Sequence, residues 1–245
     1  MLPYPRCHSR SGGALLAALC AFALALPACK GTEQAAPPNG TQSQRTRIEV
    51  VLINGGGRPA SNYQSHLLHV KQLHRLLRRS GIPESAIEIF SSDGSDPEAD
   101  LAVRKLQPEA DFWLLSGTRL ERSLRTRTTY ENSEVGEISL RPASNEALRA
   151  FFRDAARRLR PGETLLLYVT DHGTKNEQDT SNNRITLWGK NESLSVTELQ
   201  ELVGWLDPGV RVVALMSQCY SGAFANLMYT GAANGTPRGN VCGFY

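Results

Sequence analysis

Short apolar runs rich in Val, Ile and Leu recur along the chain and have the composition of buried strands. They occupy residues 48–54, 86–90, 111–116, 165–170 and 210–217, and a last one starts at about Asn240. Several of these runs end in Gly, Asn, Asp or Ser, which are residues that favour turns. The pattern predicts strands that are covered on both faces, as in a parallel sheet.

Three longer stretches between these runs repeat apolar residues with the period of a helix. They lie at about 63–79, at about 145–159 and after Ser195. Gly81 is placed to end the first helix, and Ser195 with Glu198 forms a capping box for the third. Strands that alternate with helices in this way predict an α/β sandwich with a largely parallel sheet.

The first 29 residues have the layout of a secretory signal peptide. Arg6 and Arg10 precede an apolar run at 14–26, which is too short to span a membrane comfortably. Its end, Leu-Pro-Ala-Cys29, resembles a bacterial lipobox, in which the cysteine carries a lipid and becomes the mature N-terminus. We expect lipidation of Cys29, with ordinary cleavage and release as the alternative.

Residues 30–46 are polar and rich in Pro, Gly and Thr, and we interpret them as a flexible linker to a domain at 47–245. The residue after Cys29 is Lys30 rather than Asp, which by resemblance to other lipoproteins favours the outer membrane of a Gram-negative cell. The expected location is therefore the bacterial cell envelope, with a periplasmic or secreted form as the alternative.

The composition is that of an ordinary globular domain, with 40% hydrophobic and 21% charged residues and a net charge of +3. Basic residues are densest at 119–127, where we expect a solvated loop or helix face. A nucleic-acid partner would need a reading motif or stacking aromatic residues beside that cluster, and neither is evident. We therefore expect no nucleic-acid partner.

Two predicted strands end in chemically capable residues, one in Asp171-His172-Gly173 and the other in Gln218-Cys219. Reactive residues gather at the carboxyl ends of parallel strands, so these two ends are expected to meet. A thiol needs a neighbouring base to become an effective nucleophile, and His172 is a candidate for that base. The alternative for Cys219 is a structural disulfide with Cys242, the other cysteine of the domain.

Two other kinds of site are conceivable and receive less support. Asn54-Gly-Gly-Gly-Arg58 follows a strand, but its glycine spacing is not the dinucleotide fingerprint. His66, His69 and His74 do not share one helical face cleanly, and no cysteine or carboxylate joins them, so we expect no metal site. No cofactor is predicted.

Three ordered motifs resemble the legumain family of cysteine peptidases and its caspase-like relatives. Tyr168-Val-Thr-Asp-His-Gly173 is similar to the histidine-bearing strand end, and Met216-Ser-Gln-Cys-Tyr-Ser-Gly222 to the cysteine loop. Asn62-Tyr63, with Ser-Gly-Ile-Pro at 80–83, resembles the first strand-helix-strand unit. The resemblance covers about residues 48–245 and implies a caspase-like three-layer α/β/α sandwich with a mostly parallel central sheet.

The resemblance implies a cysteine-type endopeptidase that acts on peptides or proteins through a thioester. Cys219 would be the nucleophile and His172 the acid and base, with the N–H groups of Gly173 and Cys219 as the oxyanion hole. Asn62 matches the residue that orients the histidine, although a helix cap or turn explains it nearly as well. The residues expected to contact substrate are Asp171, Gln218 and Ser221, with a structural role as the alternative for Asp171.

The sequence departs from the family at two places. Legumains follow Asn-Tyr with an arginine that helps to build the specificity pocket, whereas Gln64 and Ser65 stand here, so asparaginyl specificity does not carry over. The chain ends at Tyr245, 26 residues after Cys219, where caspase-like folds continue. We therefore expect an incomplete chain with an open pocket and weak activity. The alternative function is a catalytically silent module that binds peptide or serves as a scaffold.

Overall fold

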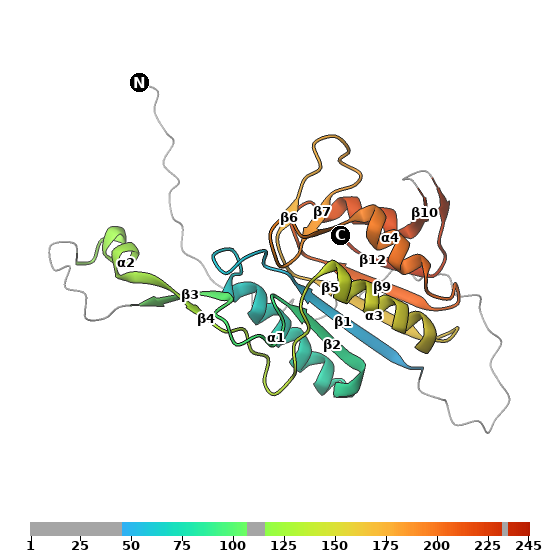
Figure 1. Ribbon diagram of the computed structural model, residues 1–245, viewed down its shortest axis with the longest axis horizontal. Coiled ribbons are helices and arrows are strands. Elements are labelled where there is room, and N and C mark those ends of the chain that lie inside the picture. Colours follow the sequence, from blue (N-terminus) through green and yellow to red (C-terminus); the bar gives the residue numbers. More distant parts are fainter. Residues whose placement is uncertain (1–45, 107–115, 232–234) are drawn as a thin grey trace, which may run out of the picture.

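A parallel sheet of five strands forms the centre of the protein (Figure 1). The computed structural model describes residues 46–106, 116–231 and 235–245. The strand order is β12-β9-β5-β1-β2, and every neighbouring pair runs parallel. The strands are β1 (Ile48–Asn54), β2 (Ile87–Ser91), β5 (Thr164–Val169), β9 (Arg211–Met216) and β12 (Val241–Phe244). The strands expected at 48–54, 86–90, 165–170 and 210–217 and from about Asn240 are confirmed within one or two residues.

Helices cover both faces of the sheet, and the alternation along β1 shows how. Val50 and Leu52 belong to a core cluster with Leu67 and Val70 of α1 (Gln64–Arg79). Val51 and Ile53 point the other way, into a larger cluster with α3 (Asn145–Arg158) and α4 (Val196–Gly204). Successive side chains of a strand face opposite sides of its sheet, so one strand serves both clusters. The predicted three-layer α/β/α sandwich with a parallel sheet is therefore confirmed.

Local capping explains where two of these helices begin. The hydroxyl of Ser195 accepts the Glu198 N–H, and the Glu198 carboxylate accepts the Ser195 N–H, which is the predicted capping box of α4. Ser144 caps α3 in the same manner by accepting the Ala147 N–H at 3.2 Å. These contacts satisfy backbone donors that the first turn of a helix leaves unpaired.

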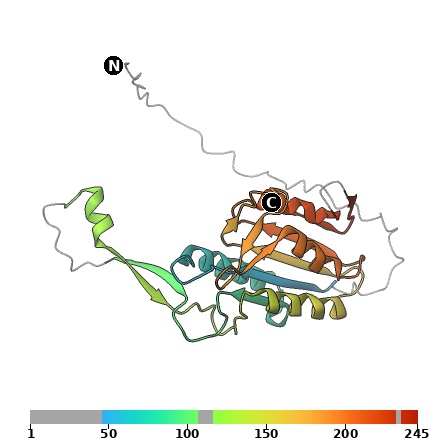
Figure 2. The ribbon, with the colours of Figure 1, turned by 45° about the horizontal axis from the view of Figure 1, so that its top comes forward.

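A hairpin that the sequence did not predict projects from the body beside α1 (Figures 1 and 2). It consists of β3 (Leu101–Leu106) and β4 (Thr126–Glu131), with the short helix α2 (Arg119–Arg125) leading into β4. At its base the Ala102 N–H donates to the Asn62 carbonyl at 2.9 Å. Of the strand predicted at 111–116, residues 111–115 lie outside the described residues.

A small antiparallel sheet follows His172 and packs beside the carboxyl edge of the central sheet. Its strands are β6 (Gly173–Thr174), β7 (Arg184–Thr186) and β8 (Ser193–Ser195), in that order. The remaining short elements are η1 (Glu84–Ala86), η3 (Ser221–Met228), β10 (Tyr229–Thr230) and β11 (Thr236–Pro237). The small sheet matters for function because it carries the chain directly away from the predicted catalytic histidine.

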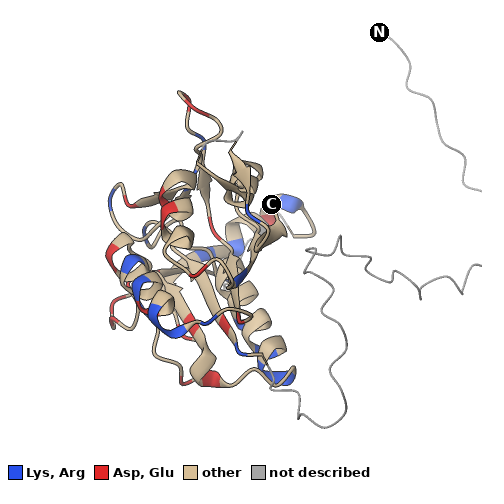
Figure 3. Cartoon of the chain, turned by 90° about the vertical axis from the view of Figure 1, so that its right-hand side faces the viewer, with Lys and Arg blue, Asp and Glu red and all other residues tan. Residues whose placement is uncertain are grey.

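Charged residues of both signs are interspersed over the helices and loops (Figure 3). Within the described residues, no helix combines the length and apolar character that a membrane crossing requires. The signal peptide predicted at 1–29 lies outside the described residues, as does the linker predicted at 30–46 except for its last residue. Both therefore stay predictions.

Candidate active site

The register of the strands places His172 and Cys219 at equivalent positions beyond the carboxyl ends of two neighbouring strands. β5 and β9 are neighbours, and Val169 of β5 pairs with Met216 of β9 at their carboxyl ends. His172 and Cys219 each lie three residues beyond that pair. The Ser217 N–H donates to the Val169 carbonyl at 2.9 Å, so the two chains stay joined as they leave the sheet.

The two loops that follow these strands touch at Gly173. A Cβ atom on Gly173 would lie 1.8 Å from the carbonyl oxygen of Cys219, so the backbone of the histidine loop rests directly on the cysteine loop. Cys219 is exposed, and no disulfide joins it to Cys242. Cys242 lies on β12, where it pairs with Val213. The alternative of a Cys219–Cys242 disulfide is therefore not met in this structure.

The ring of His172 is held by a backbone carbonyl. Its Nε2 lies 2.8 Å from the carbonyl oxygen of Ser61. A carbonyl can only accept a hydrogen bond, so Nε2 carries the proton and Nδ1 of the neutral ring is left as the basic nitrogen. The rings of Tyr63 and His66 stand edge-on to His172 at centroid distances of 5.2 Å and 5.0 Å. The side chains of Tyr63 and His66 thus enclose two sides of the His172 imidazole.

His66 is a neutral neighbour of His172 over most of the pH range. Burial, together with the smaller effect of the nearby charges of His172 and His69, lowers the pKa of His66 to about 4. Because His66 stays uncharged above that pH, it does not repel a proton held by His172. This contact could not be predicted from sequence, since His66 and His172 are far apart in the chain.

The side chain of Asn62 lies in a buried hydrogen-bond network, which favours the turn interpretation over direct orientation of His172. Its side chain is fully buried and accepts the Nδ2–H of Asn54 at 3.1 Å. It donates in turn to the Ser92 hydroxyl at 2.6 Å and to the Asp100 carbonyl at 3.0 Å. The group that orients His172 is the carbonyl of the preceding residue, Ser61. Asn62 acts on His172 indirectly, by fixing the loop that presents this carbonyl.

Asp171 is a buried link between two loops, which favours a structural role over the predicted contact with substrate. Its carboxylate accepts the N–H groups of Gly55 at 2.5 Å, Gly56 at 3.0 Å and His172 at 2.5 Å. Burial raises the pKa of Asp171 to about 6, although these hydrogen bonds lower it. The carboxylate thus ties the loop after β1 to the end of β5. It also uses the glycine N–H groups that a nucleotide phosphate would need, which disfavours the nucleotide-binding alternative.

The turn after Cys219 requires a left-handed residue, and Tyr220 provides it with φ of 59°. The Nδ2–H of Asn183 donates to the Tyr220 carbonyl at 3.3 Å and supports this conformation. Residues other than glycine adopt it at a cost, and such strain clusters at functional sites. Ser221 is half-buried as the first residue of η3, and its assignment to substrate binding stays a prediction.

Gln218 is buried beside Gly173 rather than displayed on the surface. It is 3% exposed, and neither its Oε1 nor its Nε2 has a hydrogen-bond partner among the described residues. Burying an amide group without hydrogen-bond partners costs free energy. The Gln218 side chain would therefore gain stability from any hydrogen bond that a change in its surroundings offers. Its assignment to substrate binding stays a prediction.

The N–H group of Gly173 is not used by the small sheet. Gly173 pairs with Ile185 across β6 and β7, and the Thr186 N–H donates to the His172 carbonyl at 3.0 Å. This pattern makes Gly173 and Ile185 a non-hydrogen-bonded pair, so the Gly173 N–H points away from β7. The Gly173 N–H therefore takes no part in the hydrogen bonds between β6 and β7. The predicted oxyanion-hole role requires an N–H of this kind.

The histidines of α1 are not gathered as metal ligands. The Nδ1 of His69 lies 3.1 Å from the Thr170 hydroxyl, and the Nε2 of His74 lies 3.0 Å from a Glu84 carboxylate oxygen. Across the described ranges, no group of three or more His, Cys, Asp or Glu residues is arranged to hold a metal ion. His69 and His74 thus each contact a different residue outside α1.

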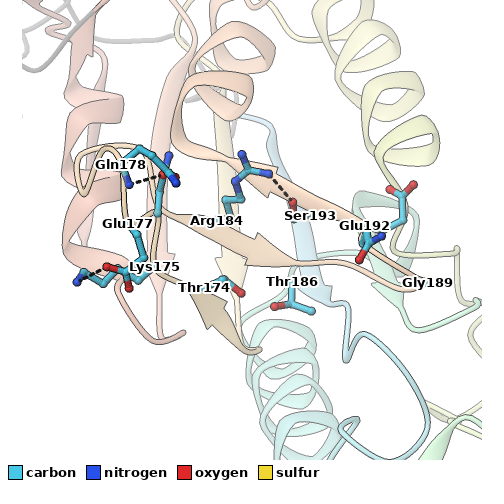
Figure 4. Close-up of a pocket in the computed structure, with 11 residues that line it drawn as sticks. Thr174, Lys175, Glu177, Gln178, Arg184, Thr186, Gly189, Glu192 and Ser193 are labelled. Atoms are coloured by element: carbon cyan, nitrogen blue, oxygen red, sulfur yellow. Dashed lines mark hydrogen bonds and ion pairs between the residues drawn. The ribbon is translucent and has the colours of Figure 1, made fainter.

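Two cavities flank the loop between β7 and β8. One, of about 490 Å³, is lined by the 174–178 segment, Arg184 and neighbours (Figure 4). The other, of about 540 Å³, lies against the 57–61 loop. Thr186, Gly189 and Asn191 line both cavities, so together they form one recessed region beside His172.

Comparisons with known proteins add little to this geometry. No protein-family model matches the chain, and a search of curated proteins gave no match. Among solved structures, the chain is similar to protein GSU0716 from Geobacter sulfurreducens, with 26% sequence identity and a TM-score of 0.28. The match covers 31% of this chain and 31% of the length of that chain. Function is therefore inferred from the site itself.

Proposed function

We propose that this chain is a cysteine-type endopeptidase with Cys219 as nucleophile and His172 as general base and acid. The observation that carries the proposal is the register of β5 and β9, which sets both residues three positions beyond the pair Val169–Met216. Cys219 is exposed and the His172 ring is oriented by the Ser61 carbonyl, and a thiol nucleophile needs such a base within reach. The resemblance of the surrounding motifs to legumains and caspases agrees with it.

In the proposed first step, Nδ1 of His172 takes the proton of the Cys219 thiol, and the sulfur attacks the scissile carbonyl carbon. The Ser61 carbonyl keeps the Nε2 proton in place, so the ring can become an imidazolium without turning. The carbonyl oxygen becomes an oxyanion that the N–H groups of Gly173 and Cys219 would stabilise. His172 then gives the proton to the leaving amine as the carbon–nitrogen bond breaks, which leaves a thioester.

In the second step, His172 takes a proton from water, whose oxygen attacks the thioester carbonyl. The carbon–sulfur bond breaks, the sulfur recovers a proton through His172, and the acid product leaves. The reaction consumes one water and needs no redox partner. Apart from the Ser61 carbonyl, which lies in the loop after β1, each role thus belongs to a group beyond the carboxyl end of β5 or β9.

A peptidyl acyloxymethyl ketone tests this proposal, because it alkylates a thiolate only where peptide binding and activation coincide. We expect one adduct, mapped to Cys219 by mass spectrometry, together with loss of cleavage of a defined peptide mixture. Cys242→Ala serves as the control and should be labelled like the wild type. Labelling that is unchanged in His172→Ala, or absent at Cys219, would favour the catalytically silent peptide-binding module.

We further propose that the chain is a lipoprotein of the cell envelope, anchored through Cys29. The proposal is supported by the lipobox-like Leu-Pro-Ala-Cys29 and by Lys30, which favours the outer membrane. Cells fed labelled palmitate should incorporate label into the wild type, and Cys29→Ser should incorporate none. Equal labelling of the two proteins, or none in either, would instead support a periplasmic or secreted form.

A further inference from the structure

A cavity of about 540 Å³ lies between the loop after β1 and the loop after β7. The two loops are joined at its floor, where the Gly189 N–H donates to the Gly57 carbonyl at 3.0 Å. Arg58 and Lys190 follow these two glycines directly, so the hydrogen bond brings both cations to the same cavity. Both residues are exposed.

The charge of this cavity is positive and not neutralised by the protein. No Asp or Glu lines it, and within the described ranges neither Arg58 nor Lys190 forms a salt bridge. The half-buried indole of Trp188 supplies an apolar wall. Two cations that form no salt bridge, next to an indole, are suited to bind a carboxylate group carried by a short apolar chain.

The neighbouring cavity gives a direct contrast, because two cations and two carboxylates line it and each is hydrogen-bonded within the protein (Figure 4). Lys175 binds Glu177 at 3.0 Å, and Glu192 accepts a hydrogen bond from Asn145 at 2.8 Å. Arg184 donates to the Ser193 hydroxyl at 3.5 Å. The positive character is thus specific to the cavity of Arg58 and Lys190.

The position of the cavity indicates which part of a substrate it meets. Ser61 lines it, and the Ser61 carbonyl holds His172, whereas no residue of the 217–228 segment around Cys219 lines it. In a Cys-His reaction the histidine protonates the leaving amine, so the segment after the cleaved bond departs on the histidine side. This cavity therefore faces the leaving-group segment.

We propose that the cavity of Arg58, Lys190 and Trp188 binds a carboxylate in the leaving-group segment of the substrate. An acidic side chain and the terminal carboxylate of a short substrate present the same chemistry. The inference rests on the proposed peptidase function, because that reaction defines which segment leaves. The consequence is a selectivity for acidic sequences or chain ends after the cleaved bond.

Matched peptides test the inference on the full chain. One pair carries Asp or Asn at the first two positions after the cleaved bond, and another ends there in a free or an amidated carboxyl group. We expect kcat/KM to favour the carboxylate member by about tenfold or more in at least one pair, because charge-assisted hydrogen bonds are strong. The preference should weaken as salt is added.

The double variant Arg58→Gln/Lys190→Gln should reduce the preference to within about twofold, mainly through KM. The control Arg153→Gln/Arg157→Gln removes two exposed cations from α3 and should keep the preference. The pair that responds identifies the source of the carboxylate. Cleavage that depends on Cys219 but shows no preference, or one that survives the double variant, would overturn the inference and leave the proposed function standing.

Fluorescence separates failure of the inference from failure of the proposed function. Acetyl-aspartyl amide should change the emission of Trp188, with Trp188→Phe as reference, whereas acetyl-asparaginyl amide should not. A change that Arg58→Gln/Lys190→Gln removes would establish the carboxylate site even in a chain without cleavage activity. No carboxylate-dependent change in an inactive chain would overturn both proposals.

Discussion

Replacing Cys219 by alanine is expected to lower kcat/KM for peptide cleavage by about 10⁴-fold or more, because the thioester can no longer form. His172→Ala should cost a similar factor, since the thiol then lacks the base whose Nε2 the Ser61 carbonyl holds. The double variant should be little worse than either single one, because the two residues act as a unit. Initial rates on one fluorogenic peptide measure all three.

Cys242→Ala provides the matched control for this series and should retain activity. Cys219 is exposed and outside the hydrophobic core, so Cys219→Ala should unfold at nearly the same temperature as the wild type. Cleavage that persists in Cys219→Ala would show that another group is the nucleophile. Losses in the two single variants that multiply in the double variant would contradict a coupled dyad.

Gly173→Ala is expected to lower activity by about 100-fold or more, although it adds a single methyl group. The new Cβ would lie 1.8 Å from the Cys219 carbonyl oxygen, well inside contact distance. That neighbour is backbone, so the cysteine loop or the histidine loop must shift. Displacements of about 1 Å at reacting groups cost on the order of 100-fold in rate.

Two measurements check this prediction against a general folding defect. Gly239→Ala is the control, because its Cβ would have no atom within 4 Å, and it should behave like the wild type. Thermal unfolding of Gly173→Ala should show a modest loss of stability beside the large loss of kcat. A Gly173→Ala enzyme with wild-type activity would mean that the two loops do not touch in the working protein.

The layered fold could be predicted from sequence because a strand that is buried on both faces has a continuous run of apolar residues. β1 alternates between two hydrophobic clusters, so its four consecutive residues from Val50 to Ile53 are all apolar. The β3–β4 hairpin could not be found in this way. Leu106 and Tyr130 are among its exposed positions, and its strands lack the apolar run that a core requires.

The sequence indicated the two candidate reacting residues and did not indicate the carbonyl group that orients one of them. His172 and Cys219 are distinctive residues at strand ends, and the register of β5 and β9 brings those ends together. The group that orients His172 is a backbone carbonyl, which any residue could supply. The role of Ser61 therefore could not be predicted from its residue type. Asp171 was predicted to contact substrate because the sequence does not reveal that its buried carboxylate accepts hydrogen bonds from three backbone N–H groups.

The pairing of β5 with β9 has a consequence for how such a protein can diversify. Register, rather than the length of the intervening chain, sets His172 and Cys219 at equivalent positions beyond two neighbouring strands. The 175–182 segment and the 187–192 loop lie between the two strands in sequence and outside the central sheet in space. Insertions and exchanges there can remodel the cavities and leave the reacting atoms where they are. Over evolutionary time, substrate preference can thus drift independently of the chemical step.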